Sequence, residues 1–102
     1  MKIKYIYKNS DVILNVVLRD CSGEIIPIES IDEIDYVFFT NEEYSYNANI
    51  EDGKIYIPSN IISNFQSGIL KYNVHIALSN EHFEDGKQDI YYNNKSTNIY
   101  IK

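Results

Sequence analysis

The sequence predicts an all-β fold, an antiparallel β-sandwich of about seven strands. Short segments in which apolar and polar residues alternate follow one another along the chain, with turn signals roughly every 8 to 12 residues. Ten tyrosines and no tryptophan add a residue type that is enriched in strands. The 102 residues suffice for one hydrophobic core, so a single domain over residues 1–102 is expected.

Four of the expected strands lie in the first half of the chain. The alternation covers residues 2–7, 12–19, 34–40 and 44–50. β-Branched residues dominate residues 12–19, which are therefore expected to form a central strand.

The connections within this half carry turn residues. Residues 20–23, which include Cys21, combine Asp with Gly and are expected to form a tight turn in which the cysteine is an ordinary turn residue. Pro27 cannot donate to a hydrogen-bond ladder, so residues 24–28 are expected at a sheet edge or in a linker. Residues 29–33 support at most a single helical turn.

The clearest hairpin signal is the Asp-Gly pair in residues 51–53, because these residues readily supply the positive φ values of a tight connection. A strand at residues 54–58 is expected to follow it. Residues 59–65 are expected to form one or two helical turns that place their apolar side chains under the edge of the sandwich.

Residues 69–79 form the longest alternating segment and are expected to be a central strand. The polar residues 80–86 predict a hairpin loop. After it, residues 87–92 and 97–102 form either one bent strand or two short strands. Short strands with turn signals at this spacing are typical of an immunoglobulin-like sandwich.

Composition excludes several classes of partner. The formal net charge is −6 and Arg19 is the only arginine, so a surface that neutralises nucleic-acid phosphates is not expected. No apolar run reaches the roughly 18 residues of a membrane span, and residues 1–8 alternate instead of forming a secretory signal. The single cysteine excludes an intramolecular disulfide framework and a cysteine-rich zinc site. We therefore expect synthesis in a reducing cytoplasm and no membrane contact.

Residues that carry chemistry are sparse, and we predict no catalytic residue, cofactor or metal ion. The only histidines, His75 and His82, are expected on a polar strand face and in a loop, away from any nucleophile elbow or phosphate loop. The loop with Glu81, Glu84 and Asp85 has the oxygen ligands that calcium prefers, but its spacing matches no calcium motif. An acidic hairpin tip is the favoured interpretation, and the chain is predicted not to be an enzyme.

Tyrosines are the candidates for an interaction surface, since they are enriched at protein interfaces. Four of them are in phase with apolar strand positions and are interpreted as core residues: Tyr36, Tyr44, Tyr46 and Tyr72. Four others lie in the terminal strands, which are expected to form sheet edges: Tyr5, Tyr91, Tyr92 and Tyr100. Because edge strands can pair with another chain, the second group is the predicted interface.

Several of these features follow one another in a recognisable order. They are Asn9-Ser10-Asp11 with the strand after it, Cys21-Ser22-Gly23-Glu24, Tyr36-Val37-Phe38-Phe39, the hairpin in residues 51–58, and Phe65-Gln66-Ser67-Gly68 before Leu70-Lys71-Tyr72. In this order the chain resembles, over most of its length, the N-terminal immunoglobulin-like domain of phage baseplate upper proteins. The resemblance implies an immunoglobulin-like sandwich and no catalytic motif.

In that family the domain normally begins a longer polypeptide. A free-standing copy is similar to the small immunoglobulin-like accessory proteins that decorate capsids or tails of tailed phages, including the crAss-like phages. The resemblance therefore implies a structural protein of a tailed-phage virion, either a capsid decoration or a tail or baseplate component, made in the host cytoplasm. Its implied partners are other virion proteins, and homo-oligomers are compatible with this interpretation. A carbohydrate-binding or adhesion module is the alternative, and it predicts an exposed row of tyrosines on one face.

Overall fold

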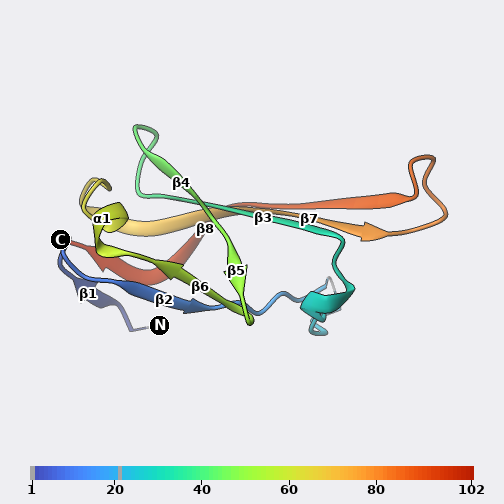
Figure 1. Ribbon diagram of the computed structural model, residues 1–102, viewed down its shortest axis with the longest axis horizontal. Helices are drawn as coiled ribbons and strands as arrows, with labels where there is room; N and C mark the ends of the chain where they lie inside the picture. Colours follow the sequence, from blue (N-terminus) through green and yellow to red (C-terminus); the bar gives the residue numbers. More distant parts are fainter. Residues whose placement is uncertain (1, 21) are drawn as a thin grey trace.

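Two β-sheets face each other in the computed structural model, which describes residues 2–20 and 22–102 (Figure 1). The strand order is β1-β8-β7-β3-β4 in the five-stranded sheet and β2-β6-β5 in the three-stranded sheet. The strands are β1 (Lys4–Ile6), β2 (Val12–Asn15), β3 (Glu33–Phe39), β4 (Ser45–Ala48), β5 (Ile50–Glu51), β6 (Lys54–Ile57), β7 (Gly68–Ser79) and β8 (Lys87–Ile101). The predicted all-β sandwich is confirmed. Cys21, interpreted above as a turn residue, lies outside the described residues.

Two short helical segments connect the strands. The single turn expected near residues 29–33 is a 3-10 helix, η1 (Ile28–Ser30). The turn expected after Pro58 is α1 (Ser59–Ile62), and Ile62 and Phe65 at its end are buried in the core, as predicted. No helix in residues 2–20 and 22–102 is long and apolar enough to cross a membrane.

β7 is a central strand, as its alternation predicted. β3 pairs with it antiparallel from Glu33↔Ala77 to Phe39↔Lys71, and β8 pairs with its other side. Leu70, Val74 and Ile76 are buried on one face of β7, so this face forms one wall of the core. The other face points away from the three-stranded sheet, and we call this side of the five-stranded sheet the outer face.

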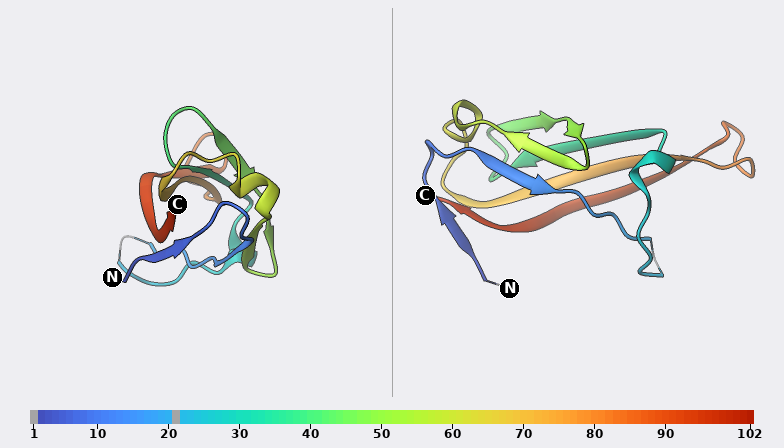
Figure 2. Two further views of the ribbon diagram at one scale, coloured as in Figure 1. Left: turned by 90° about the vertical axis from the view of Figure 1, so that its left-hand side faces the viewer. Right: turned by 60° about the horizontal axis from the view of Figure 1, so that its bottom comes forward.

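The C-terminal segment is one bent strand, which settles the choice between one strand and two. The register of β8 against β7 shifts between Ile69 and Lys71 and again between Tyr72 and Val74. Extra residues on β8 absorb these shifts, and one of them, Asn94, has a φ of 56°. The β7–β8 hairpin extends well beyond the sandwich and gives the molecule extents of 46 × 26 × 22 Å (Figures 1 and 2).

The prediction that residues 12–19 form a central strand was wrong. β2 ends at Asn15 and lies at an edge of the three-stranded sheet, with β6 as its partner. The backbone N–H of Val16 still donates to Gly53 O at 2.9 Å, and Arg19 then forms an isolated bridge with Ile25. The segment 12–19 therefore extends beyond the end of β6, and only its first four residues, which form β2, pair with that strand.

The β1–β8 pair is parallel, which differs from the expected all-antiparallel pattern. The register joins Lys4 to Ile99 and Ile6 to Ile101. These strands lie at opposite ends of the chain, so no tight hairpin joins them and none forces an antiparallel arrangement. Burial of Ile6 beside Ile101 decides the pairing instead.

The core lies between the sheets and follows the period-two alternation. Tyr36 is buried and stacks on Phe38, with ring centroids 5.9 Å apart. The other three tyrosines assigned to the core, Tyr44, Tyr46 and Tyr72, are partly buried and pack against it. The core assignment is thus confirmed for Tyr36, and the other three tyrosines lie at the margin of the core.

The β5–β6 turn needs a glycine. Asp52 and Gly53 have φ values of 51° and 74°, and a Cβ at Gly53 would meet only Ile28 Cδ1, at 3.9 Å. Because there is room for the methyl group, Gly53→Ala is expected to cost only the backbone strain, about 1 kcal/mol of unfolding free energy. Urea unfolding followed by circular dichroism measures it, with the exposed Ser67→Ala as the control. An unchanged midpoint in Gly53→Ala would contradict the strain argument.

Candidate functional site

The outer face of the five-stranded sheet carries three of the four predicted interface tyrosines. Tyr100 lies between the buried Ile99 and Ile101, so it points to the opposite side of the strand, and its register partner Tyr5 points the same way. Tyr91 is the register partner of His75, whose strand neighbours Val74 and Ile76 are buried in the core. All three rings therefore share one face.

Tyr92 does not join them. It lies on the core side of β8 beside Val74, is partly buried, and packs against the core. Its hydroxyl donates to the backbone oxygen of Arg19 at 3.0 Å and so links β8 to the chain beyond β2. Only three of the predicted four tyrosines can therefore contact a partner on the outer face.

The three outward tyrosines form two separate groups. Tyr100 pairs with Ile69 and Tyr91 pairs with His75, six residues further along β7. At about 3.3 Å per residue, the two positions are roughly 20 Å apart. The continuous row of tyrosines that the carbohydrate-binding alternative predicts is therefore interrupted.

The first group, which we call the terminal tyrosine cluster, consists of Tyr5, Tyr7, Tyr100 and Lys102. The Tyr5 and Tyr100 ring centroids are 5.4 Å apart, and Lys102 Nζ lies 5.4 Å from the centroids of both Tyr5 and Tyr7. Tyr5 and Tyr7 are 59% and 65% exposed. Tyrosine is enriched at protein interfaces, so two exposed rings side by side are typical of a contact surface. Tyr5 lies on β1, the edge strand of the five-stranded sheet, and Tyr7 follows that strand. Tyr100 lies on the neighbouring β8, and Lys102 follows it.

Sequence reasoning missed two members of this cluster. Tyr7 lies two residues after Tyr5, and Lys102 lies two residues after Tyr100, so alternation places each on the same side of its strand as that tyrosine. The sequence pattern did not indicate that the two ends of the chain are neighbours. The parallel pairing of β1 with β8, extended by the hydrogen bond from the Lys102 N–H to Ile6 O at 2.9 Å, brings Tyr7 and Lys102 together.

The second group consists of Tyr91, His75 and Asp89. The His75 and Tyr91 rings stack with centroids 4.4 Å apart and an angle of 17° between their planes. His75 Nε2 lies 2.9 Å from Asp89 Oδ1, which fixes the imidazole beneath the tyrosine. Tyr91 is 64% exposed, so the stack presents a flat, positioned aromatic face to solvent.

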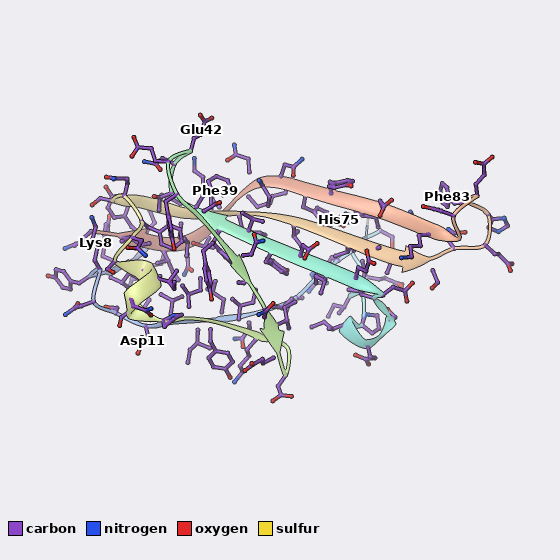
Figure 3. All side chains as sticks on the ribbon, turned by 45° about the horizontal axis from the view of Figure 1, so that its top comes forward. Lys8, Asp11, Phe39, Glu42, His75 and Phe83 are labelled. Carbon is purple, nitrogen blue, oxygen red and sulfur yellow. The ribbon has the colours of Figure 1, made fainter. Side chains whose placement is uncertain are left out.

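A groove of about 590 Å³ lies beside this stack on the outer face. Its lining combines the Phe39 ring with several amide side chains, and the Asn94 N–H donates to Asn73 Oδ1 at 2.7 Å, which orients that amide. Figure 3 shows Phe39 and His75 along the same sheet, with Glu42 on the loop above. Amides beside an aromatic ring can hydrogen-bond and stack on a polar ligand.

The acidic loop between β7 and β8 is a hairpin tip, as favoured from the sequence. Asn80 Oδ1 accepts from the His82 N–H at 3.0 Å, and Asp85 Oδ1 accepts from the Lys87 N–H at 3.0 Å, so these side chains shape the turn. In the part of the chain that the structure describes, no group of three or more His, Cys, Asp or Glu side chains could hold a metal ion.

Among the described residues, two pKa values depart from their ordinary range. At the 20–24 turn, the hydroxyl of Ser22 at 2.6 Å and the backbone N–H of Glu24 at 3.0 Å lower the pKa of the exposed Asp20 carboxyl. In the core, burial raises the pKa of the Tyr36 hydroxyl well above 10.0, and the neighbouring Tyr72 adds to the effect.

The Tyr36 shift predicts how the protein responds to alkali. Because folding favours the neutral hydroxyl, its contribution to stability is complete below about pH 10 and is lost as the pH rises above that value. Tyr36→Phe should therefore unfold at higher pH than the wild type, as measured by circular dichroism, whereas the exposed Tyr91→Phe should not. In a tyrosinate absorbance titration, complete ionisation of all tyrosines in the folded protein would contradict the prediction.

Together these features define an all-β, two-sheet sandwich with aromatic side chains displayed on one outer face. Comparisons of the chain with models of protein families, with curated proteins and with solved structures find no match.

Proposed function

We propose that this chain is a non-enzymatic structural protein of a tailed-bacteriophage virion, which binds other virion proteins through the outer face and free edge of its five-stranded sheet. The observation that carries the proposal is the terminal tyrosine cluster. It gathers two exposed tyrosine rings and a lysine beside the edge strand β1, whose outer side pairs with no other strand among the described residues and so can pair with a partner.

The strand order supports the immunoglobulin-like assignment on which the virion proposal rests. With the strands lettered in chain order as A, B, C, C′, D, E, F and G, one sheet is B-E-D and the other contains G-F-C-C′. Immunoglobulin-like sandwiches separate their strands into the same two groups. The first strand, β1, joins the last strand here instead of its neighbour in sequence.

Mass spectrometry of purified phage particles tests the virion assignment. The chain should be present in the particles, and its copy number relative to the major capsid protein distinguishes the two locations. A number comparable to that protein would indicate capsid decoration, and far fewer copies would indicate a tail or baseplate component. If the chain occurs in infected cells but never in purified particles, the proposal is wrong.

A matched pair of variants tests the surface. The double variant Tyr5→Ala, Tyr7→Ala should lose incorporation into particles, because it removes the exposed rings of the terminal tyrosine cluster. Tyr56→Ala is the control, since Tyr56 is also exposed, at 46%, but lies on the three-stranded sheet. Both proteins should keep the wild-type circular dichroism spectrum. Equal incorporation of the two would exclude the cluster as the contact surface.

The groove beside Phe39 favours the alternative, a carbohydrate-binding or adhesion module. Amide groups and an aromatic ring are suited to hydroxyl-rich ligands. A glycan array with the wild-type chain, repeated with Phe39→Ala, tests this alternative. Binding that is lost in Phe39→Ala but kept in the Tyr5 and Tyr7 variant would favour it over the virion proposal.

A further inference from the structure

One flank of the sandwich is open between β2 and β8. Two adjoining cavities of about 360 and 260 Å³ lie along it and share Val17 and Tyr72 in their linings. We call them together the flank groove. Its floor is formed by apolar and aromatic side chains from both sheets, among them Leu14, Val16, Tyr36, Phe38 and Val74. The buried Tyr36, Phe38 and Val74 lie at the bottom of the groove, and the partly buried Leu14, Val16 and Tyr72 form its accessible apolar wall.

Among the residues that the structure describes, the strands that border the flank groove have no strand paired to them along the groove. The Val16 N–H bonds Gly53 O on the β6 side, so by alternation the peptide groups of Asn15 and Val17 face away from β6. In the described chain, the pairing of β8 with β1 covers only Ile99 to Ile101 of the long strand. A segment that enters the flank groove can thus combine apolar contacts with main-chain hydrogen bonds.

The flank groove is basic in an acidic chain. Its lining includes Arg19 and Lys95 and, over the described residues, no Asp or Glu, while the whole chain carries a formal charge of −6. Arg19 also donates to Gly23 O at 2.8 Å, which holds its guanidinium at the end of the groove. An apolar side chain flanked by carboxylates is the complementary ligand.

The chain carries this ligand at its far end. The tip of the β7–β8 hairpin presents Phe83, which is 49% exposed, next to Glu81, Glu84 and Asp85. Figure 3 shows Phe83 on the projecting loop. Lys95 lies nine positions after Gly86 along the hairpin, which at about 3.3 Å per residue is roughly 30 Å, so the tip cannot reach the flank groove of its own copy.

We propose that the chain self-associates head to tail, with the hairpin tip of one copy inserted into the flank groove of the next. Phe83 enters the apolar groove, and the carboxylates of the tip face Arg19 and Lys95. The contact joins two different surfaces, so each copy keeps one free tip and one free groove and can extend into a ring or a filament. This proposal does not rest on the virion assignment, because it uses a different surface from the terminal tyrosine cluster.

Sedimentation velocity over a range of protein concentrations tests self-association. The wild-type chain should show a mass that rises with concentration and falls in high salt, because salt screens the charged part of the contact. Phe83→Ala should weaken association by at least about tenfold, as expected for an aromatic anchor in a pocket. A wild-type chain that stays monomeric at every concentration would overturn the proposal and leave an acidic segment of another protein as the occupant.

A charge exchange tests the geometry. The tip variant carries Glu81→Lys, Glu84→Lys and Asp85→Lys. The groove variant carries Arg19→Glu and Lys95→Glu. A milder groove variant carries Lys95→Glu alone. Each variant should be monomeric by itself, because its two surfaces then have the same charge. An equimolar mixture should associate again, since each contact between the two variants is complementary. Association of either variant alone, or a mixture that stays monomeric while both circular dichroism spectra are native, would refute the contact.

Discussion

Phe38→Ala is expected to lower the free energy of unfolding by about 3–5 kcal/mol. Phe38 is 1% exposed and packs between two aromatic neighbours, with its ring centroid 5.9 Å from that of Tyr36 and 5.8 Å from that of Tyr72. Removing the ring leaves a cavity that this rigid cluster cannot fill. A domain of this size has roughly 5–15 kcal/mol of stability, so the variant should be close to unfolding. Urea unfolding monitored by far-ultraviolet circular dichroism measures the change.

Phe83→Ala provides the control for this prediction, because it makes the same chemical change at the exposed hairpin tip. At a low protein concentration its unfolding free energy should lie within about 0.5 kcal/mol of the wild type. Equal losses in the two variants would contradict the assignment of Phe38 to the core.

Ile76→Asp is expected to prevent folding at neutral pH. Ile76 is 0% exposed on the central strand β7, between β3 and β8. A carboxylate at this position would be buried among apolar side chains, and an unpaired buried charge costs several kcal/mol or more. One-dimensional proton NMR should show loss of the dispersed methyl and amide signals of the folded chain.

Asn73→Asp is the matched control, because it adds a carboxylate to the same strand on the outer face. Asn73 Oδ1 accepts from the Asn94 N–H at 2.7 Å, and an aspartate oxygen can accept the same bond. The NMR spectrum should stay dispersed, with an unfolding free energy within about 1 kcal/mol of the wild type. A folded Ile76→Asp, or an unfolded Asn73→Asp, would mean that the two faces of β7 are assigned the wrong way round.

The faces of the long strands could be predicted from the chain alone. Side chains of a strand point alternately to its two sides, so the pattern in residues 69–79 was enough to place Leu70 and Ile76 in the core. The Asp-Gly turn at residues 51–53 was equally readable, because its positive φ values favour a glycine. These are local properties, and each depends on residues that are close together in sequence.

The candidate site was predicted less completely. Tyr5, Tyr91 and Tyr100 share the outer face, but Tyr92 has the opposite phase and faces the core. A one-residue offset in β8, caused by the irregularity near Asn94, is enough to reverse which of two adjacent tyrosines points outward. Alternation cannot locate such an offset within a run of polar residues.

The sequence by itself determined the all-β class, the faces of the long strands and the tight turns. Only the tertiary structure decided that β2 lies at an edge, that β1 pairs in parallel with β8, and that Tyr7 and Lys102 complete the terminal tyrosine cluster. It also decided that β2 and β8 leave a basic, apolar groove between them. The physical reason is that alternation is the same for edge and central strands. Which edges stay open depends on pairing between segments nearly a full chain length apart.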